Sequence, residues 1–361
     1  MPAALLIPAS ENFPAAAARL ILQVHAPPDL SRVTLLVPTP ALIRPLRRAL
    51  ARAAGGALLG PQVLTLPAFA QERGAAGSAL SPLDARLLLA AALEPHLHLF
   101  PQQDAVALAG ELQNLFEQLS AQAQQLALDE AQFRRRVEQG YGGSNGAISR
   151  EAQIVHLLWR AYLDQTHGAS PRVSFQLALK RALAGIADDE QLWLAGFDRL
   201  AADEAALLRG ALAAKRACVL LHGRLRGRDC AANTALCQLL HVEPEMLPAQ
   251  PDARSTWLDA IFAEDAAPLR QRLPRTDAAA LPRLQAARSP EHEARMADLA
   301  IRRWLLAGKR DIAVVAQDRR YARRLRALLE RAQVPLSDEI GWALSTSAAA
   351  ASLMHWLDVC E

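Results

Sequence analysis

Short apolar runs alternate with longer amphipathic segments at the beginning of the chain. Residues 4–7, 33–38 and 62–66 are runs of mainly Ala, Val, Leu and Ile, and helical spacing of apolar residues follows the first two. A continuous apolar run of this length is typical of a strand that is buried on both faces. Strands that alternate with helices in this way predict a parallel sheet with crossover helices.

The pattern changes near residue 78 and returns about a hundred residues later. Amphipathic helical spacing dominates from Ser81, where Ser-Pro-Leu-Asp is a typical helix start with proline at the first helical position. Strand-like runs return at 191–196 and 217–222. The sequence therefore predicts an α/β domain made of residues 1–78 and 186–275, with an all-helical insertion over residues 79–185.

A further α/β pattern begins near residue 280. Apolar runs at 284–287 and 311–316 predict strands, and helical spacing predicts helices over 290–306 and 319–331. Glu291 and its neighbour Glu293 would favour the first of these helices, because acidic groups are stabilising near a helix N-terminus. We expect residues 280–361 to begin a second α/β domain.

Composition narrows the class of protein without naming a function. The 361 residues are 52% hydrophobic and carry a formal net charge of only +3, so they form no global basic field. Arginine makes up all but three of the 40 basic residues, and its planar fork suits phosphate groups. The four cysteines lack metal-type spacing, and neither a signal peptide nor an apolar run of membrane length is visible. We therefore expect a cytoplasmic protein without a membrane span.

The turn after the first predicted strand lacks the residues that hold a phosphate. A nucleotide-binding loop needs glycines that expose backbone N–H groups and a lysine that reaches the β- and γ-phosphates. Residues 8–14 read Pro-Ala-Ser-Glu-Asn-Phe-Pro instead. The strand, turn and helix thus have the order of a mononucleotide-binding unit without its phosphate-binding chemistry.

The order of segments resembles that of superfamily 1 DNA helicases. The similarity is strongest to the N-terminal region of AddB-type helicase–nuclease subunits, a group of inactivated helicases. Two phrases carry most of it, LWLAGFDRLAADEAALL at 192–208 and RSPEHEARMADLAIRRWLLAGKRDIAVV at 288–315. The resemblance implies a RecA-like parallel sheet with an all-helical inserted subdomain and the start of a second RecA-like domain.

The resemblance also implies a DNA-binding surface. Residues 33–50 and 62–70 look like helicase segments beside single-stranded DNA, and 311–329 like the opening of the second RecA-like domain. A solvated helix face is the alternative for the arginines, and the pattern alone favours it; for Phe69 the pattern favours a place in the core. The residues that we expect to contact DNA are Thr39, Arg44, Arg47, Arg48, Thr65, Arg319, Arg320 and Arg323.

The chain departs from active helicases at three places of one site. Besides the first loop, Ala195 and Gly196 stand where these helicases carry Asp-Glu, while Asp203 and Glu204 lie farther along on the next predicted helix. Ala316 stands near the place of a phosphate-sensing arginine. ATP hydrolysis needs these groups together. We therefore expect no catalytic residue, no metal ligand and no cofactor in this chain.

The resemblance implies a role in DNA double-strand break repair and recombination. We expect a non-catalytic part of a helicase–nuclease complex that guides single-stranded or forked DNA and docks on the subunit with the active motor. The complete protein would add a C-terminal nuclease domain and act as an exodeoxyribonuclease subunit. Two alternatives remain: an active ATP-dependent helicase or translocase with an atypical nucleotide loop, and a purely structural docking module.

Overall fold

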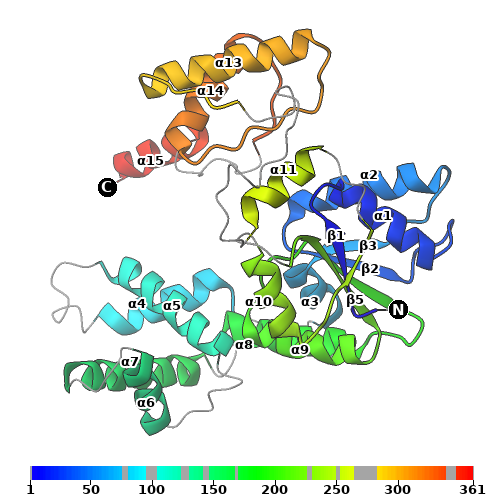
Figure 1. Ribbon diagram of the computed structural model, residues 1–361. Coiled ribbons are helices and arrows are strands. Elements are labelled where there is room, and N and C mark those ends of the chain that lie inside the picture. The colour runs from blue at the N-terminus through cyan, green and yellow to red at the C-terminus, as the bar shows by residue number, and fades with distance from the viewer. Residues whose placement is uncertain are drawn as a thin grey trace. The chain divides into compact units, whose positions relative to one another are not determined.

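The computed structural model divides the chain into two compact units, Met1–Thr276 and Asp277–Glu361. Figure 1 shows the elements of both units. The predicted domain boundaries near residue 78 and between 275 and 280 fall outside the described residues. The described residues are 2–74, 80–94, 104–122, 130–140, 146–166, 170–225, 230–248, 253–263, 283–338 and 347–360.

Six parallel strands form one sheet in the first unit, in the order β3-β2-β4-β5-β1-β6. This confirms the predicted α/β architecture, which is consistent with a RecA-like fold. Five strands coincide with the apolar runs of the sequence, whereas the two-residue β6 falls in a stretch that reads as a loop. The strands are β1 (Ala4–Pro8), β2 (Val33–Val37), β3 (Gln62–Thr65), β4 (Gln191–Ala195), β5 (Ala217–Gly223) and β6 (Glu245–Met246).

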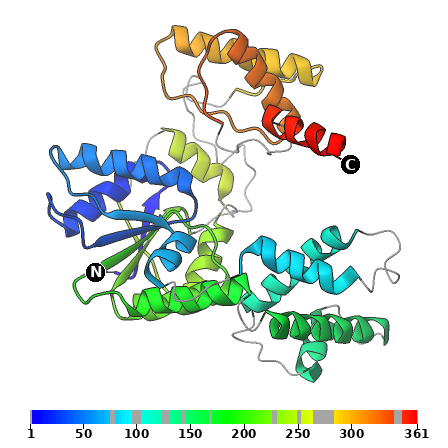
Figure 2. The ribbon, with the colours of Figure 1, turned by 180° about the vertical axis from the view of Figure 1, so that it is seen from behind.

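Helices cover both faces of the sheet, which explains why its strands are apolar throughout. Side chains alternate along each strand, so that Leu5 and Ile7 of β1 join one apolar cluster while Ala4 and Leu6 join the other. On the first face lie α1 (Phe13–Val24) and α2 (Ile43–Ala54), the latter preceded by the short 3₁₀ helix η1 (Pro40–Leu42). On the second face lie α3 (Leu66–Gly74), α8 (Pro171–Ala184), α9 (Ala202–Ala213) and α10 (Ala231–Leu240). Figure 2 shows the same arrangement from behind.

Local capping chemistry fixes where several of these helices begin and end. The side chain of Asn12 accepts a hydrogen bond from the backbone N–H of Ala15 at the start of α1, and Ser170 does the same for Val173 at the start of α8. Helix α2 ends at Gly55, whose φ of 67° is a left-handed conformation that suits glycine. These signals are local, so they can be found in the sequence.

The stretch between β3 and β4 is helical in its described parts, as the sequence predicts. A small core of its own includes Phe116, Trp159 and Tyr162. Helix α8 ends this stretch and packs differently, because its Leu179 and Ala182 are buried in the cluster beneath the sheet. The helices that precede α8 are α4 (Pro82–Leu93), α5 (Ala105–Gln122), α6 (Glu130–Gly140) and α7 (Gly146–Gln165).

The second unit consists of helices and irregular segments in its described residues. Helices α13 (Pro290–Leu306) and α14 (Arg319–Arg331) pack through Ile301, Leu325 and Leu329. The strands expected at 284–287 and 311–316 are not strands, because these residues have no ladder partner in the described part of the chain. An apolar run becomes a strand only when a neighbour accepts its backbone hydrogen bonds. Val315, for example, is 93% exposed.

Two further helices are α11 (Ala253–Phe262) in the first unit and α15 (Ala348–Cys360) in the second. Both agree with the helical spacing of the sequence. None of the helices in the described ranges is sufficiently long and apolar to cross a membrane.

Candidate functional site

The carboxyl ends of the parallel strands meet at one edge of the sheet, and this edge is the candidate site. Open parallel sheets bind their ligands in the crevice beyond these ends. The turn after β1, the residues after β4 and the start of η1 after β2 all lie at this edge. The first two would hold the phosphates and the metal ion of a nucleotide in an active RecA-like domain.

The turn after β1 uses its own backbone donors. The N–H of Glu11 donates to the carbonyl oxygen of Pro8 at 3.0 Å, and that of Ala15 donates to Asn12 Oδ1 at 3.1 Å. The N–H of Ala16 donates to the carbonyl oxygen of Asn12 at 2.9 Å, and Pro14 has no N–H at all. A phosphate binds at a helix N-terminus through free N–H groups. The first turn of α1 therefore offers an anion few donors.

Apolar side chains occupy the place beside the end of β4. Phe13 from the start of α1 and Leu42 from η1 close over Gly196, the first residue after β4. A Cβ atom on Gly196 would lie 3.0 Å from Leu42 Cδ1 and 3.1 Å from Phe13 Cε1. Gly196 also has a φ of 78°, which L side chains rarely adopt. Residues larger than glycine, including the aspartate of a helicase, do not fit here without displacing both side chains.

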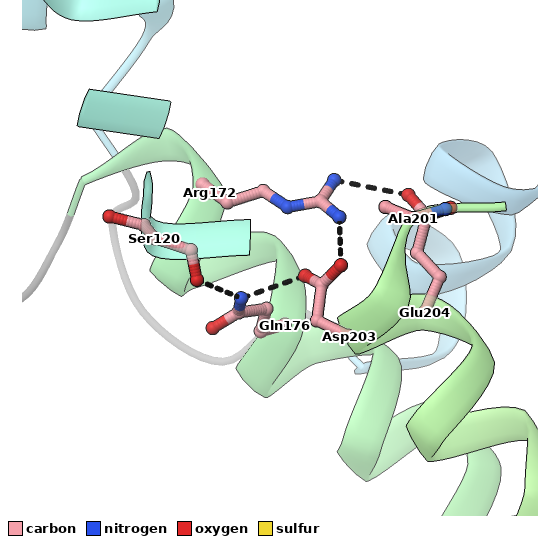
Figure 3. A network of polar contacts seen from close by, with 6 residues as sticks. All are labelled: Ser120, Arg172, Gln176, Ala201, Asp203 and Glu204. Atoms are coloured by element: carbon pink, nitrogen blue, oxygen red, sulfur yellow. Dashed lines mark hydrogen bonds and ion pairs between the residues drawn. The ribbon is translucent and has the colours of Figure 1, made fainter. Parts of the chain in front are cut away.

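Asp203 and Glu204 lie in the first turn of α9, away from the end of β4. Arg172 of α8 binds both carboxylates, with its Nη1 donating to Glu204 Oε1 at 3.0 Å and its Nη2 donating to Asp203 Oδ1 (Figure 3). The other oxygen of Glu204 accepts the N–H of Ala201 at 3.0 Å, which caps the helix. The acidic pair is therefore bound within the fold, on the helix where the sequence placed it.

A second set of contacts ties this acidic pair to the helical insertion. Gln176 Nε2 donates to Asp203 Oδ2 at 2.7 Å and to the carbonyl oxygen of Ser120, at the end of α5, at 3.0 Å (Figure 3). Trp159 of α7 donates its indole N–H to Ser120 Oγ at 3.1 Å. We call Ser120, Arg172, Gln176, Asp203 and Glu204 the polar joint, since it connects α5 and α8 to α9.

The pKa values around the polar joint reflect burial and charge pairing. Burial raises the pKa of Glu117, and the hydrogen bond from the Tyr162 hydroxyl at 2.9 Å and the charge of Arg172 offset this only in part. Burial alone would lower the pKa of Arg172, but the bonds and charges of Asp203 and Glu204 outweigh it and raise this pKa. Arg172 is therefore held as a cation by its partners.

The two threonines expected to contact DNA lie at the carboxyl edge. Thr65 is the last residue of β3 and pairs in register with Val37 of β2. Thr39 lies two residues after Val37, is exposed, and precedes η1. Thr65 Oγ1 also accepts the N–H of Ala68 at 3.4 Å, close to the limit of a hydrogen bond. Phe69 is fully buried, with the guanidinium of Arg73 5.5 Å from its ring centroid, so it belongs to the core.

Arg44, Arg47 and Arg48 form an exposed row on α2, opposite its buried leucines. Arg52, one turn after Arg48, extends the row, although it is not among the residues that the sequence predicts to contact DNA. Its spacing of four from Arg48 places it on the same face of the helix. No carboxylate in the described ranges forms an ion pair with these arginines. We call these four side chains the α2 arginine row.

The local charge around α2 differs from that of the chain as a whole. Residues 13–71 contain six arginines and a single acidic residue, Asp29, which gives this segment a formal charge of +5. The whole chain has a formal charge of only +3. Arg19 and Arg32 pair with Glu11 and Asp189, which lie outside this segment, so the basic charge without an acidic partner is that of the α2 arginine row.

The arginines of α14 belong to the second unit and are largely engaged. Arg319, Arg320 and Arg323 are exposed, but the first and third have interaction partners of their own. Their neighbour Arg324 donates to both oxygens of Glu291, at 2.5 and 2.7 Å. The hydrogen bonds from Arg324, helped by Arg295, lower the pKa of Glu291 to about 2. The basic charge of α14 is thus partly neutralised by acidic neighbours.

In the parts of the chain that the structure describes, no cluster of His, Cys, Asp and Glu side chains could hold a metal ion. Burial raises the pKa of Cys218 to about 12, so this thiol stays protonated at neutral pH. The described site is therefore built from arginines, threonines and a closed apolar contact. Comparison of the sequence with protein-family models and with curated proteins finds no match to either.

Proposed function

We propose that this chain is a non-catalytic, helicase-like part of a complex that repairs DNA double-strand breaks. It binds or guides a single-stranded or forked DNA strand at the carboxyl edge and the α2 arginine row, and it docks on a partner subunit that carries the motor. The observation that carries this proposal is the closure of Phe13 and Leu42 over Gly196 in a RecA-like sheet.

The geometry of the carboxyl edge argues against a nucleotide-driven cycle. Phosphoryl transfer depends on a cradle of backbone N–H groups, a lysine and a metal-binding acid. At this edge Pro14 has no N–H, Asn12 caps Ala15, and apolar groups surround Gly196. Asp203, the nearest candidate for a metal ligand on α9, already binds Arg172 and Gln176. The proposed role of this edge is therefore to bind a strand without a nucleotide cycle.

The α2 arginine row supports DNA as the ligand. Its side chains are exposed, have no carboxylate partner among the described residues, and lie in a segment of charge +5. Arginine and threonine side chains are common donors to phosphate oxygens, and such contacts position a protein on DNA without reading its sequence. The α14 row supports this role less strongly, because Glu291 and Glu330 bind two of its arginines.

Isothermal titration with ATP and magnesium tests the missing motor. We expect no binding heat at micromolar concentrations of the protein, because the groups that grip a triphosphate are absent. Clear micromolar binding would favour the alternative function, an ATP-dependent helicase with an atypical loop. Single-stranded DNA titrated into the same sample is the positive control for a functional preparation.

Alanine substitutions on the two arginine-rich helices test the DNA surface. Replacing Arg44, Arg47 and Arg48 together should weaken binding of single-stranded DNA and reduce the slope of log K against log salt by about 2, since each phosphate contact on a single strand contributes about 0.7. The matched triple variant at Arg319, Arg320 and Arg323 removes the same charge and should have a smaller effect. If the α14 variant loses more affinity than the α2 variant, the surface has been assigned to the wrong helix.

The docking role needs a separate measurement. A purely structural module would form a stable complex with the motor subunit and bind no DNA when isolated. A chain with the proposed function should do both, which co-purification with the motor subunit and DNA titration of the isolated chain can distinguish.

A further inference from the structure

The chemistry of the α2 surface restricts which part of a nucleic acid it can contact. From Pro38 to Gly60 the side chains that can form hydrogen bonds are Thr39 and the four arginines, and all others are aliphatic or absent. The segment contains no Asn, Gln, Asp or Glu, which are the residues that read adenine and cytosine edges. Its arginines suit phosphate oxygens, and guanine is the one base whose edge they also match well.

The Phe, Tyr and Trp side chains offer no exposed platform for base stacking in the described part of the first unit. Proteins that hold single strands by their bases expose aromatic rings on which successive bases stack. In the described part of the first unit, every Phe, Tyr and Trp side chain is buried or half-buried. Phe13 and Phe197, which lie nearest the carboxyl edge, are 8% and 6% exposed. The exposed imidazole of His222 packs against Phe13, with the ring centroids 5.4 Å apart.

The hollow beside the arginine row is aliphatic as well. It has a volume of about 370 Å³ and is lined by Arg47, Leu50, Ala51, Leu58, Gly60 and Pro61. Neither an aromatic ring nor an amide side chain lines it, so a base that entered it would find mainly aliphatic contacts and one guanidinium. Arg44, Arg48 and Arg52 follow one another at intervals of four residues, about 6 Å along the helix axis, so they can reach separate phosphates of one strand.

We propose that the α2 surface, if it binds nucleic acid as proposed above, recognises the sugar–phosphate backbone alone. The ligand class is a polyanionic phosphodiester strand, and the bases contribute neither stacking nor hydrogen bonds. Removal of every base from a strand leaves its affinity unchanged. With four arginine–phosphate contacts, log K falls with log salt at a slope of about −3, so affinity drops about fiftyfold between 50 and 200 mM salt.

Fluorescence anisotropy with two labelled strands of equal length tests this inference on the whole chain. One strand contains all four bases, so that pairing of arginine with guanine would be detected, and the other carries a stable abasic residue at every position. We expect dissociation constants within about twofold of each other and equal salt slopes. Each stacked base would be worth at least about fivefold in affinity, so a strand with several stacked bases would differ far more.

The outcomes separate this inference from the proposed function. Binding of the base-bearing strand with weak or absent binding of the abasic strand overturns backbone-only recognition and leaves DNA binding intact. Failure of both strands to bind at 50 mM salt overturns the proposed function together with the inference. Replacing Arg44, Arg47, Arg48 and Arg52 together with alanine should lower the affinity for both strands by the same factor. The circular dichroism spectrum of this variant should match that of the parent, because all four side chains are exposed. A loss confined to the base-bearing strand would contradict the proposal.

Discussion

The guanidinium group of Arg172 binds two carboxylates on α9, the helix that follows the place of a helicase acid pair. Asp203 has no exposed side-chain surface and Arg172 is 18% exposed, so the pair is shielded from water. In such surroundings an unpaired charge is costly, because desolvation is no longer offset by its partner. The residue that makes Asp203 structural lies 31 positions away in the chain.

Replacing Arg172 with alanine should therefore destabilise the protein by about 3–5 kcal/mol, since it leaves Asp203 buried without its cation. Urea unfolding measures this change. Arg19→Ala, which removes the exposed partner of Glu11, is the matched control and should cost less than about 1 kcal/mol. Equal effects of the two substitutions would show that the polar joint contributes nothing beyond a surface pair.

Glu117 should make the stability depend on pH in the direction opposite to most carboxylates. Burial raises its pKa above 4.5, so the folded state holds the proton more tightly than the unfolded state. The contribution of Glu117 is thus fully present below pH 4.5 and declines as pH rises through its raised pKa. Glu117→Gln should flatten this decline and raise the free energy of unfolding at pH 7, measured by urea titration across pH. A variant less stable than the parent at pH 7 would contradict this expectation.

The contact between α3 and α8 shows how closely two helices approach when one carries glycine at the crossing. Gly74 ends α3, and a Cβ atom there would lie 1.7 Å from the carbonyl oxygen of Ala178. This approach allows α8 to pack against α3, which follows β3 directly, and to bury Leu179 in the same cluster as Phe69. The single glycine therefore determines how near the last helix of the insertion can come to the sheet.

Gly74→Ala should destabilise the first unit by about 1–3 kcal/mol, because the added methyl group forces the helices apart. Gly210→Ala on α9 is the matched control, since no atom lies within 4 Å of the position that its Cβ atom would take. That substitution should stabilise the protein by about 0.5–1 kcal/mol through helix propensity. Thermal unfolding of both variants shows whether each substitution lowers or raises the stability. A stabilised Gly74→Ala variant would contradict the close crossing of α3 and α8.

Elements with local signals could be predicted, whereas those that depend on distant partners could not. The apolar runs that became β1 to β5 and the helix start at Ser81 are visible in the sequence. Residues 311–316 are as apolar and β-branched as the true strands. In the described part of the chain, however, no neighbouring strand forms backbone hydrogen bonds with them. The short β6 has no pattern of its own and exists because Leu5 and Leu6 pair with it.

The candidate site follows the same division. The missing lysine and glycines of residues 8–14 and the arginines of α2 could be read from the sequence. The closure of Phe13 and Leu42 over Gly196 could not, because these residues come from three separate segments and have no shared local pattern. Composition also does not reveal that Glu291 binds Arg324, which lies 33 residues later. This ion pair leaves α14 with less positive charge for binding phosphate.

At the scale of the whole molecule, the division into two units separates the two arginine-rich helices. Helix α2 lies within Met1–Thr276, and so do the buried residues that form both apolar clusters of the sheet. Helix α14 has its own contacts with α13. The surface proposed to bind DNA therefore has its structural support in the first unit.

A fragment of residues 1–276 should consequently fold and keep the DNA affinity and the salt slope of the full chain. Circular dichroism checks the fold, and fluorescence anisotropy at several salt concentrations checks the binding. A folded fragment whose salt slope is lower by about 2 or more would assign several phosphate contacts to the second unit and so to α14.

The closure over Gly196 also limits how this chain can change over evolutionary time. Installing an acid at position 196 would place a side chain on a left-handed backbone and against two apolar groups. The side chains of Phe13 and Leu42 would have to move aside, and a lysine would still be missing from the turn after β1. A single substitution at position 196 therefore strains the backbone without completing a nucleotide site.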